Sequence, residues 1–258
     1  MGRIIAIANQ KGGVGKTTTA INLSSCLAIA EKRVLLIDID PQANATSGLA
    51  LTLEEAKPSI YELLLGETSI DDIVLETGVP FLDLVPSHIR LVGSEIELIN
   101  MDGRERRLKE KLGRIRDQYE YIFIDCPPSL GLLTINALTA SDTVLIPIQC
   151  EYYALEGLSQ LLNTIHLVQR NLNKALTIEG VLLTMYDNRL NLSQQVAAEV
   201  RDYFKEKVYK TIINRNVRLG EAPSFGKPIL MYDAVSVGAQ NYISLAEEIL
   251  KNENKKTR

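Results

Sequence analysis

The feature that most constrains the fold is a short apolar run that leads directly into a glycine-rich loop and then a helical pattern. Residues 4–7 predict a buried strand, residues 11–18 (Lys-Gly-Gly-Val-Gly-Lys-Thr-Thr) the loop, and residues 16–31 a helix. Glycines let backbone N–H groups turn toward anionic oxygens, and the helix N-terminus adds partial positive charge. We therefore expect a phosphate-binding loop.

Each residue of this loop has an expected role. Lys16 is expected at the β- and γ-phosphates of a nucleotide, and the Thr17 hydroxyl at Mg²⁺. The residues expected to contact the nucleotide are Lys11, Gly12, Gly13, Val14, Gly15, Lys16, Thr17 and Thr18.

Apolar strand-like runs alternate with helical patterns along the whole chain. Several runs are apolar on both faces, which is typical of parallel strands covered by helices on both sides. We expect one α/β domain spanning 1–258, with a doubly wound, mostly parallel twisted sheet and a polar tail at 251–258 that frays. Strands are expected at 4–7, 34–37, 82–85, 121–124, 144–148, 178–183 and 210–213, and helices near 16–31, 104–118, 130–140, 153–171, 193–206 and 239–251.

Composition excludes several classes of protein. The apolar runs fall far short of the roughly 20 residues needed to cross a bilayer, and the N-terminus lacks the pattern of a signal peptide, so we expect a cytoplasmic protein. The three cysteines are odd in number and have no C-x-x-C spacing, which favours buried thiols over disulfides or a zinc site.

The net charge of −4 is unevenly distributed. Residues 1–200 contain 17 Lys and Arg against 25 Asp and Glu, whereas residues 201–258 contain 11 against 7. A chain that is acidic as a whole can therefore carry a basic face in its last quarter.

Acidic residues end two of the expected strands. Asp38 and Asp40 follow the strand at 34–37, and alternation puts both on one side at the carboxyl edge, where open α/β sheets bind ligands. Asp125 follows the apolar strand at 121–124 in the pattern of a Walker B site. We expect it to hold Mg²⁺, through water.

The second lysine of the loop, Lys11, identifies a subclass. Residues 11–17 match K-G-G-x-G-K-[ST], and the chain thereby resembles the deviant Walker A ATPases. The resemblance implies an ATPase that uses ATP and Mg²⁺, with Lys11 reaching the partner's nucleotide in a nucleotide-sandwich homodimer. It also assigns Asp40 to orienting the attacking water and Asp38 to the outer shell of the metal.

Longer motifs separate the branches of this family. The cysteines do not form the pair expected of iron-binding members. Only polar residues follow Leu250, which disfavours the membrane-inserting helix of MinD-like septum-site ATPases, the main alternative. Stretches such as Asp125-Cys126-Pro127-Pro128-Ser129-Leu130-Gly131 instead resemble ParA/Soj chromosome-partitioning ATPases. The Lys11 and Asp40 matches also disfavour a small-molecule kinase.

The ParA/Soj resemblance implies partners as well as chemistry. The family binds double-stranded DNA without sequence preference as an ATP-bound dimer, and a ParB- or Spo-type centromere-binding protein stimulates hydrolysis. We therefore expect association with the nucleoid and no stable association with a membrane. Its DNA-contacting arginines correspond to Arg189 and Arg218. Lys227 is a plausible addition, for which an ordinary solvated side chain is an equal alternative.

The resemblance is less specific for the nucleoside. Asn214 and Asn216 are expected near the adenine, although Asn214 stands where the family usually has proline. Glu151 is expected at the ribose across the dimer, with a structural role as the alternative. Residues 104–116 carry seven Lys and Arg against two Glu, which we interpret mainly as a solvated face.

Overall fold

The structure is a computed structural model that describes residues 2–51, 57–151 and 156–256. It contains a seven-stranded sheet in the order β3-β4-β2-β5-β1-β6-β7. Neighbouring strands are parallel except for β3, which pairs antiparallel with β4 at one edge. The strands are β1 (Arg3–Ile7), β2 (Val34–Asp38), β3 (Leu75–Glu76), β4 (Leu82–Val85), β5 (Tyr121–Asp125), β6 (Thr143–Gln149) and β7 (Thr177–Thr184). The predicted doubly wound, mostly parallel sheet is confirmed.

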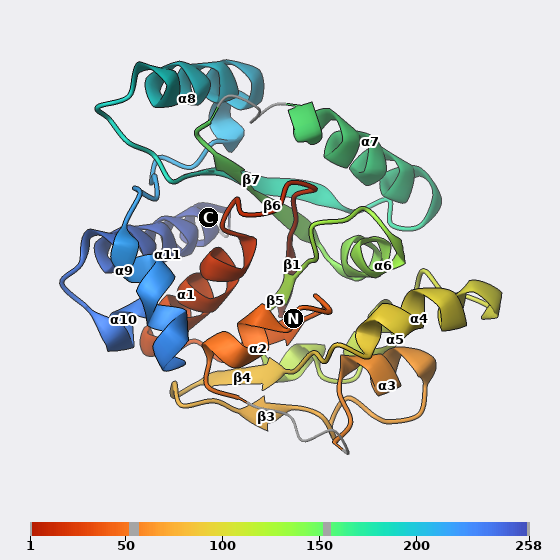
Figure 1. Cartoon of the computed structure of the whole chain (residues 1–258). Coiled ribbons are helices and arrows are strands. Elements are labelled where there is room, and N and C mark those ends of the chain that lie inside the picture. The colour runs from red at the N-terminus through yellow and green to blue at the C-terminus, as the bar shows by residue number, and fades with distance from the viewer. Residues whose placement is uncertain (1, 52–56, 152–155, 257–258) are drawn as a thin grey trace.

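Helices cover both faces of this sheet (Figure 1). The α-helices are α1 (Lys16–Ile29), α2 (Asn44–Gly48), α3 (Ile60–Leu65), α4 (Leu91–Glu97), α5 (Arg107–Leu112), α6 (Leu132–Ala140), α7 (Glu156–Asn171), α8 (Asn191–Phe204), α9 (Val217–Glu221), α10 (Ile229–Tyr232) and α11 (Val237–Lys256). Short 3-10 turns are η1 (Leu98–Asn100), η2 (Arg116–Gln118), η3 (Lys205–Lys207) and η4 (Ala222–Phe225).

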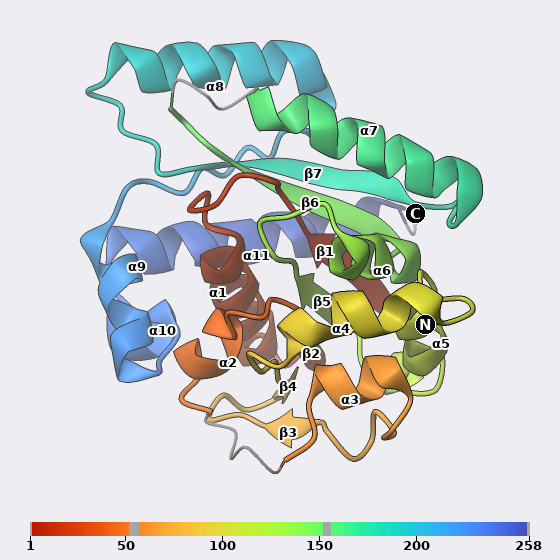
Figure 2. The ribbon, with the colours of Figure 1, turned by 45° about the vertical axis from the view of Figure 1, so that its right-hand side comes forward.

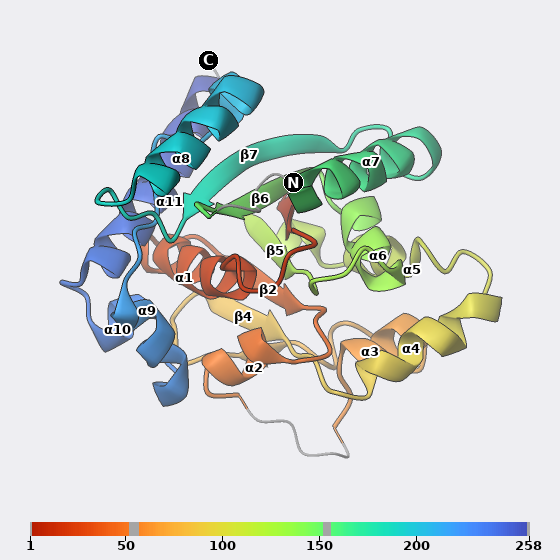
Figure 3. The same ribbon diagram turned by 45° about the horizontal axis from the view of Figure 1, so that its top comes forward.

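Alternate side chains of the strands enter two separate apolar cores. In β1, Ile4 and Ala6 pack into the core formed with α3 to α8, whereas Ile5 and Ile7 pack into the core formed with α1, α2 and α9 to α11. This is the period-two pattern of a sheet buried on both faces. The two helical layers lie on opposite sides of the strands in the rotated views (Figures 2 and 3).

The strand order brings the chemically important segments together. Because β5 lies between β2 and β1, Asp125 is in register with Asp38 on one side and with Ile7 on the other. The loop after β1 and the acidic ends of β2 and β5 therefore meet at the carboxyl edge of the sheet, as expected for a ligand site in this fold.

The strand expected at 210–213 does not form. Tyr209 and Ile213 each donate one backbone hydrogen bond to β7, at 2.9 Å, but the intervening chain leaves the sheet. The N–H groups of Lys210 and Thr211 instead donate to the carboxylate of Glu248 in α11, at 2.8 and 2.9 Å. The Glu248 carboxylate thus accepts hydrogen bonds from backbone N–H groups that would be directed along the sheet in a regular strand.

The helix expected at 239–251 is longer than predicted, because α11 begins at Val237 and continues to Lys256, while fraying of the polar tail stays a prediction. Glu253 explains the extension: its carboxylate accepts hydrogen bonds from Arg3 at the start of β1 and from Tyr121 at the start of β5. These contacts anchor the last turns of α11 to the amino edge of the sheet.

Other expected helices differ mainly at their ends. The segment at 104–118 is divided into α5 and η2, with Gly113 after the last residue of α5. The beginning of the helix expected at 153–171 lies partly outside the described residues, and α7 begins at Glu156. Strand β3 and the short helices α2, α3, α4, α9 and α10 were not expected.

Two expectations from composition can be compared with the structure. All three cysteines are buried and unbonded, as predicted. In the described ranges, no helix combines the length and the apolar character needed to cross a bilayer.

Candidate nucleotide-binding site

The glycines of the loop after β1 adopt the conformation that an anion-binding turn requires. Gly13 and Gly15 have φ angles of 74° and 87°, in the left-handed region that residues with a Cβ rarely adopt. Gly15 is the N-cap of α1, whose first turn has no side-chain cap and no acidic residue. The N–H groups at this helix end are therefore available to an anion.

Hydrogen bonds from neighbouring strands hold the loop in place. The Asn9 side chain donates to the Pro147 carbonyl (2.7 Å) and accepts from the Lys11 N–H (3.0 Å). The Thr184 hydroxyl, at the end of β7, donates to the Val14 carbonyl at 2.9 Å. The loop is thus supported by β6 and β7 as well as by its own strand.

Lys16 is buried at the start of α1, with its ammonium group donating to the Lys11 carbonyl at 3.1 Å. Burial lowers the pKa of Lys16, and the negative charges of Asp125 and Asp40 act in the opposite direction. The ammonium group therefore lies among carboxylates beneath the loop, where it can bind phosphate oxygens.

Asp125 is fully buried, and among the described residues only the Thr17 hydroxyl comes near enough to act on its carboxylate, without the geometry of a regular hydrogen bond. Its pKa is raised well above the ordinary value, first by burial and then by the neighbouring charge of Asp38, while Thr17 and Lys16 lower it. A buried carboxylate with unused oxygens is costly unless a cation or a donor compensates it. This environment fits a bound Mg²⁺.

The small number of protein groups near Asp125 that could bind a metal is compatible with Mg²⁺. Among the described residues, no group of three or more His, Cys, Asp or Glu side chains could hold a metal ion. Mg²⁺ commonly takes only one or two carboxylates and obtains its other ligands from water and substrate phosphates. Asp125 and the Thr17 hydroxyl are the residues that could hold it here.

Asp38 and Asp40 have different environments despite their spacing. Asp38 is fully buried and accepts hydrogen bonds from the Thr46 N–H, the Thr46 hydroxyl and the Asp40 N–H, at 2.8, 2.7 and 3.1 Å. Burial raises the pKa of Asp38 to about 6, against the effect of these donors. Asp40 accepts one bond from the Gln42 N–H at 2.9 Å and faces the phosphate pocket.

The predicted phosphate site is a pocket of about 360 Å³. It is lined by Gly12, Gly13, Gly15, Lys16, Thr17, Thr18, Asp40, Gln42, Asn44, Pro128 and Met185. Lys11 directly precedes the pocket residue Gly12 and is half-buried, and within the described residues its ammonium group forms no hydrogen bond or ion pair. Its charge is free to act on a group outside this chain.

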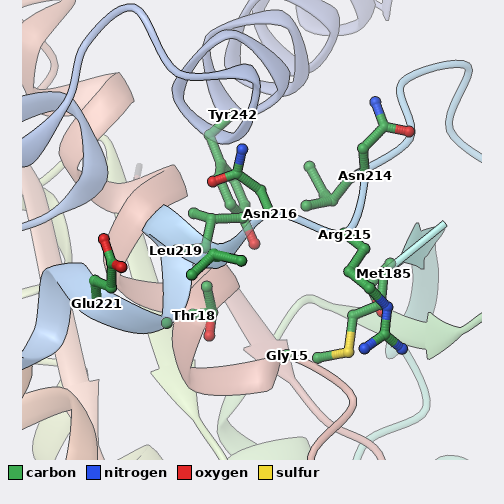
Figure 4. A pocket seen from close by; sticks show the side chains of 13 residues that line it. Gly15, Thr18, Met185, Asn214, Arg215, Asn216, Leu219, Glu221 and Tyr242 are labelled. Carbon is green, nitrogen blue, oxygen red and sulfur yellow. The ribbon is translucent and has the colours of Figure 1, made fainter. Parts of the chain in front are cut away.

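A second pocket of about 460 Å³ continues from the first and shares Gly15, Thr18 and Met185 with it (Figure 4). Its lining is largely apolar and includes Leu219 of α9 and Tyr242 of α11. A flat aromatic base attached to the phosphates could occupy this space.

The two asparagines expected at the base both line this second pocket. The Asn216 side-chain oxygen is buried and has no hydrogen-bond partner in the part of the chain that the structure describes, so it can accept from a bound base. The Asn214 backbone N–H and side-chain amide both donate to Asn241 of α11, at 3.0 and 3.3 Å. These hydrogen bonds connect Asn214 to α11, and its side chain therefore stabilises the wall of the pocket.

Several residues that line the second pocket were not predicted from the sequence. They lie far along the chain from the loop: Thr184 ends β7, Met185 follows it, Leu219 lies in α9 and Tyr242 in α11. No motif marks them. The pairing of β6 with β7, the packing of α1 against α11 and the core that Leu219 shares with both helices bring them to the site.

Glu151 follows β6 near this pocket and forms an ion pair with Arg215, 2.8 Å between Oε1 and the guanidinium. Residues 152–155, which come next, lie outside the described residues. Ribose contact by Glu151 stays a prediction, since it was expected across a dimer.

The predicted DNA-contacting arginines are exposed and paired. The Arg189 side chain is 84% exposed and forms two hydrogen bonds with the Asp187 carboxylate, at 2.9 and 2.6 Å. These bonds lower the pKa of Asp187 to about 2. Arg218 pairs with Glu221 at 2.8 Å and Asp233 at 3.5 Å. Both guanidinium groups can exchange these partners for phosphate.

Lys227 has a different setting from Arg189. It lines a third hollow, of about 270 Å³, together with Thr17 and Thr18 of α1, Asn44 of α2 and Pro223 of η4. The structure thus brings Lys227 beside the phosphate site, whereas Arg189 borders a hollow with Arg215 and Val217.

Comparison with known proteins gives concordant matches. A family model described as an AAA domain matches residues 2–178. The sporulation initiation inhibitor protein Soj of Bacillus subtilis (strain 168) is 61% identical over 252 residues, covering 98% of this chain and 100% of that protein. The chromosome partitioning protein ParA of Myxococcus xanthus (strain DK1622) is 55% identical over 257 residues, covering 100% and 91%.

Among solved structures, cobyrinic acid a,c-diamide synthase from Mycobacterium smegmatis, with bound ATP analog and magnesium, is 36% identical. The match covers 100% of this chain and 98% of that chain, with a TM-score of 0.87. The whole chain, and not the loop region alone, therefore shares its fold with a nucleotide-binding protein.

Proposed function

The chain belongs to the Soj/ParA family of chromosome-partitioning ATPases, and from this premise we propose that it hydrolyses ATP to ADP and phosphate in a nucleotide-sandwiched homodimer. The ATP-bound dimer binds double-stranded DNA without sequence preference, and a ParB-type centromere-binding protein stimulates hydrolysis. Its single P-loop domain thereby acts at the nucleoid in partitioning a chromosome or plasmid. The partitioning relatives are far more similar in sequence than the mycobacterial synthase.

The observation that carries this proposal is the position of Lys16, Thr17 and Asp40 around one pocket that continues into an apolar nucleoside pocket. The buried carboxylate of Asp125 lies close enough to Lys16 and Thr17 to interact with both. A P-loop nucleotide site needs cationic and N–H groups for phosphates, a hydroxyl and a carboxylate for Mg²⁺, and an acceptor for the attacking water. All of these groups are supplied by this chain.

In the proposed reaction, the loop N–H groups and Lys16 bind the phosphates and neutralise charge that develops as the γ-phosphate leaves. Asp40, whose carboxylate faces the pocket and has one backbone donor, accepts a hydrogen bond from water and orients it for attack. Asp125 and Thr17 would hold Mg²⁺, which supplies electrostatic stabilisation of the phosphate oxygens.

In the proposed dimer, Lys11 of one protomer contacts the nucleotide bound by the other protomer. Its ammonium group has no partner within the described part of the chain, while its backbone is fixed by Asn9. A cation held at the rim in this way suits contact with a partner's phosphates, in the manner of an arginine finger. Asp38 acts indirectly, by holding α2 beside the pocket.

The test uses Asp40→Ala, because removing the carboxylate that orients water should trap the ATP state. With ATP and Mg²⁺ we expect a dimer by analytical ultracentrifugation that retards duplex DNA of arbitrary sequence at low ionic strength. A monomer, or a dimer without DNA binding, would contradict the proposal. Asp142→Asn, which changes a carboxylate paired with Arg116 away from the pocket, is the matched control and should hydrolyse ATP normally.

A MinD-like membrane-surface function is the alternative, and residues 251–256 give it no support. Residues 251–256 continue α11 but are Lys-Asn-Glu-Asn-Lys-Lys, and membrane-surface helices require large apolar residues on one face. Co-sedimentation with anionic liposomes in the presence of ATP separates the two functions, because the proposed partition ATPase stays in the supernatant.

A further inference from the structure

We propose that Arg215 is a further phosphate-contacting residue of the DNA-binding surface, and that its ion pair with Glu151 withholds it until nucleotide binds. This inference rests on the proposed function, in which the ATP-bound dimer binds DNA. It adds a residue to the surface and a link between that surface and the nucleotide pocket.

Arg215 lies on the boundary between two hollows. It lines the nucleoside pocket, and it also lines an adjacent hollow of about 490 Å³ whose wall includes Arg189 and Val217. Its side chain is 55% exposed. A polyanion that contacts Arg189 would therefore pass within reach of a second guanidinium group.

Backbone hydrogen bonds join the two hollows. Tyr186 donates to the Ile213 carbonyl at 3.1 Å, and Arg215 donates to the Tyr186 carbonyl at 3.0 Å. The segment that forms a wall of the nucleoside pocket is thus fixed to the beginning of the loop that carries Arg189. A nucleotide against this wall acts on the same backbone unit that positions both arginines.

The ion pair between Arg215 and Glu151 explains why nucleotide binding would increase DNA binding. Glu151 is 45% exposed and contacts Arg215 through Oε1 at 2.8 Å. Exposed pairs of this kind are weak, and guanidinium groups bind phosphate as well as carboxylate. When nucleotide or the partner protomer engages Glu151, Arg215 loses its ion-pair partner and keeps only the weaker influence of Asp187, which lines the same hollow, so that it becomes available to DNA phosphate.

The experiment compares four proteins by fluorescence anisotropy with one labelled duplex of arbitrary sequence: wild type, Glu151→Gln, Arg215→Gln and the double variant. Without nucleotide at low ionic strength, we expect Glu151→Gln to bind about two- to fivefold more tightly than wild type, from the usual strength of an exposed pair. The double variant should lose this gain, because the gain acts through Arg215.

The matched control is Glu120→Gln. Glu120 pairs with Lys32 at 2.9 Å, with similar exposure, at the amino edge of the sheet. The Glu120→Gln change removes the same charge at the opposite edge of the sheet from Arg189 and Arg215, from a pair that does not involve Arg215. It should therefore leave DNA affinity nearly unchanged.

A second measurement uses the ATP-bound state in the Asp40→Ala background. There Arg215→Gln should reduce the slope of log K against log salt by about 0.9 per lost phosphate contact, whereas Arg215→Lys, which keeps the charge, should retain the slope. Circular dichroism confirms that each variant is folded.

The outcomes separate this inference from the proposed function. If Arg215→Gln leaves the salt slope unchanged, Arg215 does not contact DNA phosphate and the inference is wrong. If Glu151→Gln behaves like Glu120→Gln, Glu151 does not withhold Arg215 and the inference is wrong as well. If the parent Asp40→Ala protein itself fails to bind DNA with ATP, the proposed function is wrong instead.

Discussion

The carboxylate of Asp38 accepts two hydrogen bonds from Thr46, one from its backbone N–H at 2.8 Å and one from its hydroxyl at 2.7 Å. The same hydroxyl accepts a bond from the Ser87 N–H at 3.0 Å, and the Ser87 hydroxyl donates to the Asp40 carbonyl at 2.7 Å. This buried network ties α2 to the ends of β2 and β4. It fixes the backbone of Asp40 from both sides.

Replacing Thr46 with valine should test this network, since valine keeps the shape but removes the hydroxyl. The Ser87 N–H loses its acceptor and Asp38 loses one donor, so we expect a loss of about 1–3 kcal/mol in the free energy of unfolding and slower ATP hydrolysis. Urea denaturation and phosphate release measure the two effects. Thr46→Ser keeps the hydroxyl and should lose much less; equal losses would show that the hydroxyl is unimportant.

Asp125→Asn should have opposite effects on stability and on nucleotide binding. Without Mg²⁺, the variant replaces a buried carboxylate that makes no regular hydrogen bond within the described residues with a neutral group of the same shape, so we expect it to be more stable by about 1–3 kcal/mol at neutral pH. It should bind ATP with little response to Mg²⁺. Urea denaturation and calorimetric titration, each with and without Mg²⁺, measure these changes. A variant that is destabilised without Mg²⁺ would contradict this account of the site.

The pH dependence of Asp125 follows from the raised pKa of its folded state. A carboxylate whose pKa is higher in the folded protein stabilises the fold at pH values below its ordinary pKa, and this contribution is lost as the pH rises through the folded value. The Mg²⁺-free wild-type protein should therefore lose more stability than Asp125→Asn as the pH increases from 4 toward 7, which denaturation midpoints across a pH series can establish.

The parts of the site that could be predicted are those encoded locally. The apolar run before Asp125 and the glycines at 12, 13 and 15 determine a strand end and a turn almost independently of the rest of the chain. The alternation of strand-like and helical segments predicted parallel strands, whose carboxyl ends meet at one edge of the sheet. The pairing of Asp38 with Asp125 in the parallel strands β2 and β5 is consistent with this prediction.

The unpredicted parts depend on contacts between distant segments. Glu248 and Glu253 lie only five residues apart in α11, yet one prevents a strand at 210–213 and the other extends the helix past Leu250. Both effects depend on which residues of other elements face the carboxylate. A single sequence contains no local signal for such pairing, and the apolar wall of the nucleoside pocket, formed by Leu219 and Tyr242, was missed for the same reason.

Tyr121→Phe should loosen the end of α11. The Tyr121 side chain is buried, and its hydroxyl donates to Glu253, so its removal should lower the free energy of unfolding by about 1 kcal/mol and speed amide exchange at 251–256. Lys251→Ala, which breaks an exposed pair with Glu247 on the same helix, should have a smaller effect. Unchanged exchange in Tyr121→Phe would mean that the Tyr121 hydroxyl does not hold the helix end.

Arg189→Glu should separate DNA binding from nucleotide binding. The side chain is 84% exposed and its ion pair is with Asp187, so its replacement should not disturb the pockets at the end of the sheet. Charge reversal removes a phosphate contact and adds repulsion in both protomers, so we expect DNA affinity in the ATP state to fall by on the order of tenfold or more. Electrophoretic retardation and a fluorescent ATP analogue measure the two activities. Arg33→Glu makes the same change at an exposed position on the amino edge of the sheet and should leave both intact. If Arg189→Glu weakens ATP binding as strongly as DNA binding, Arg189 supports the fold of the nucleotide site, and the DNA-binding surface must be sought elsewhere.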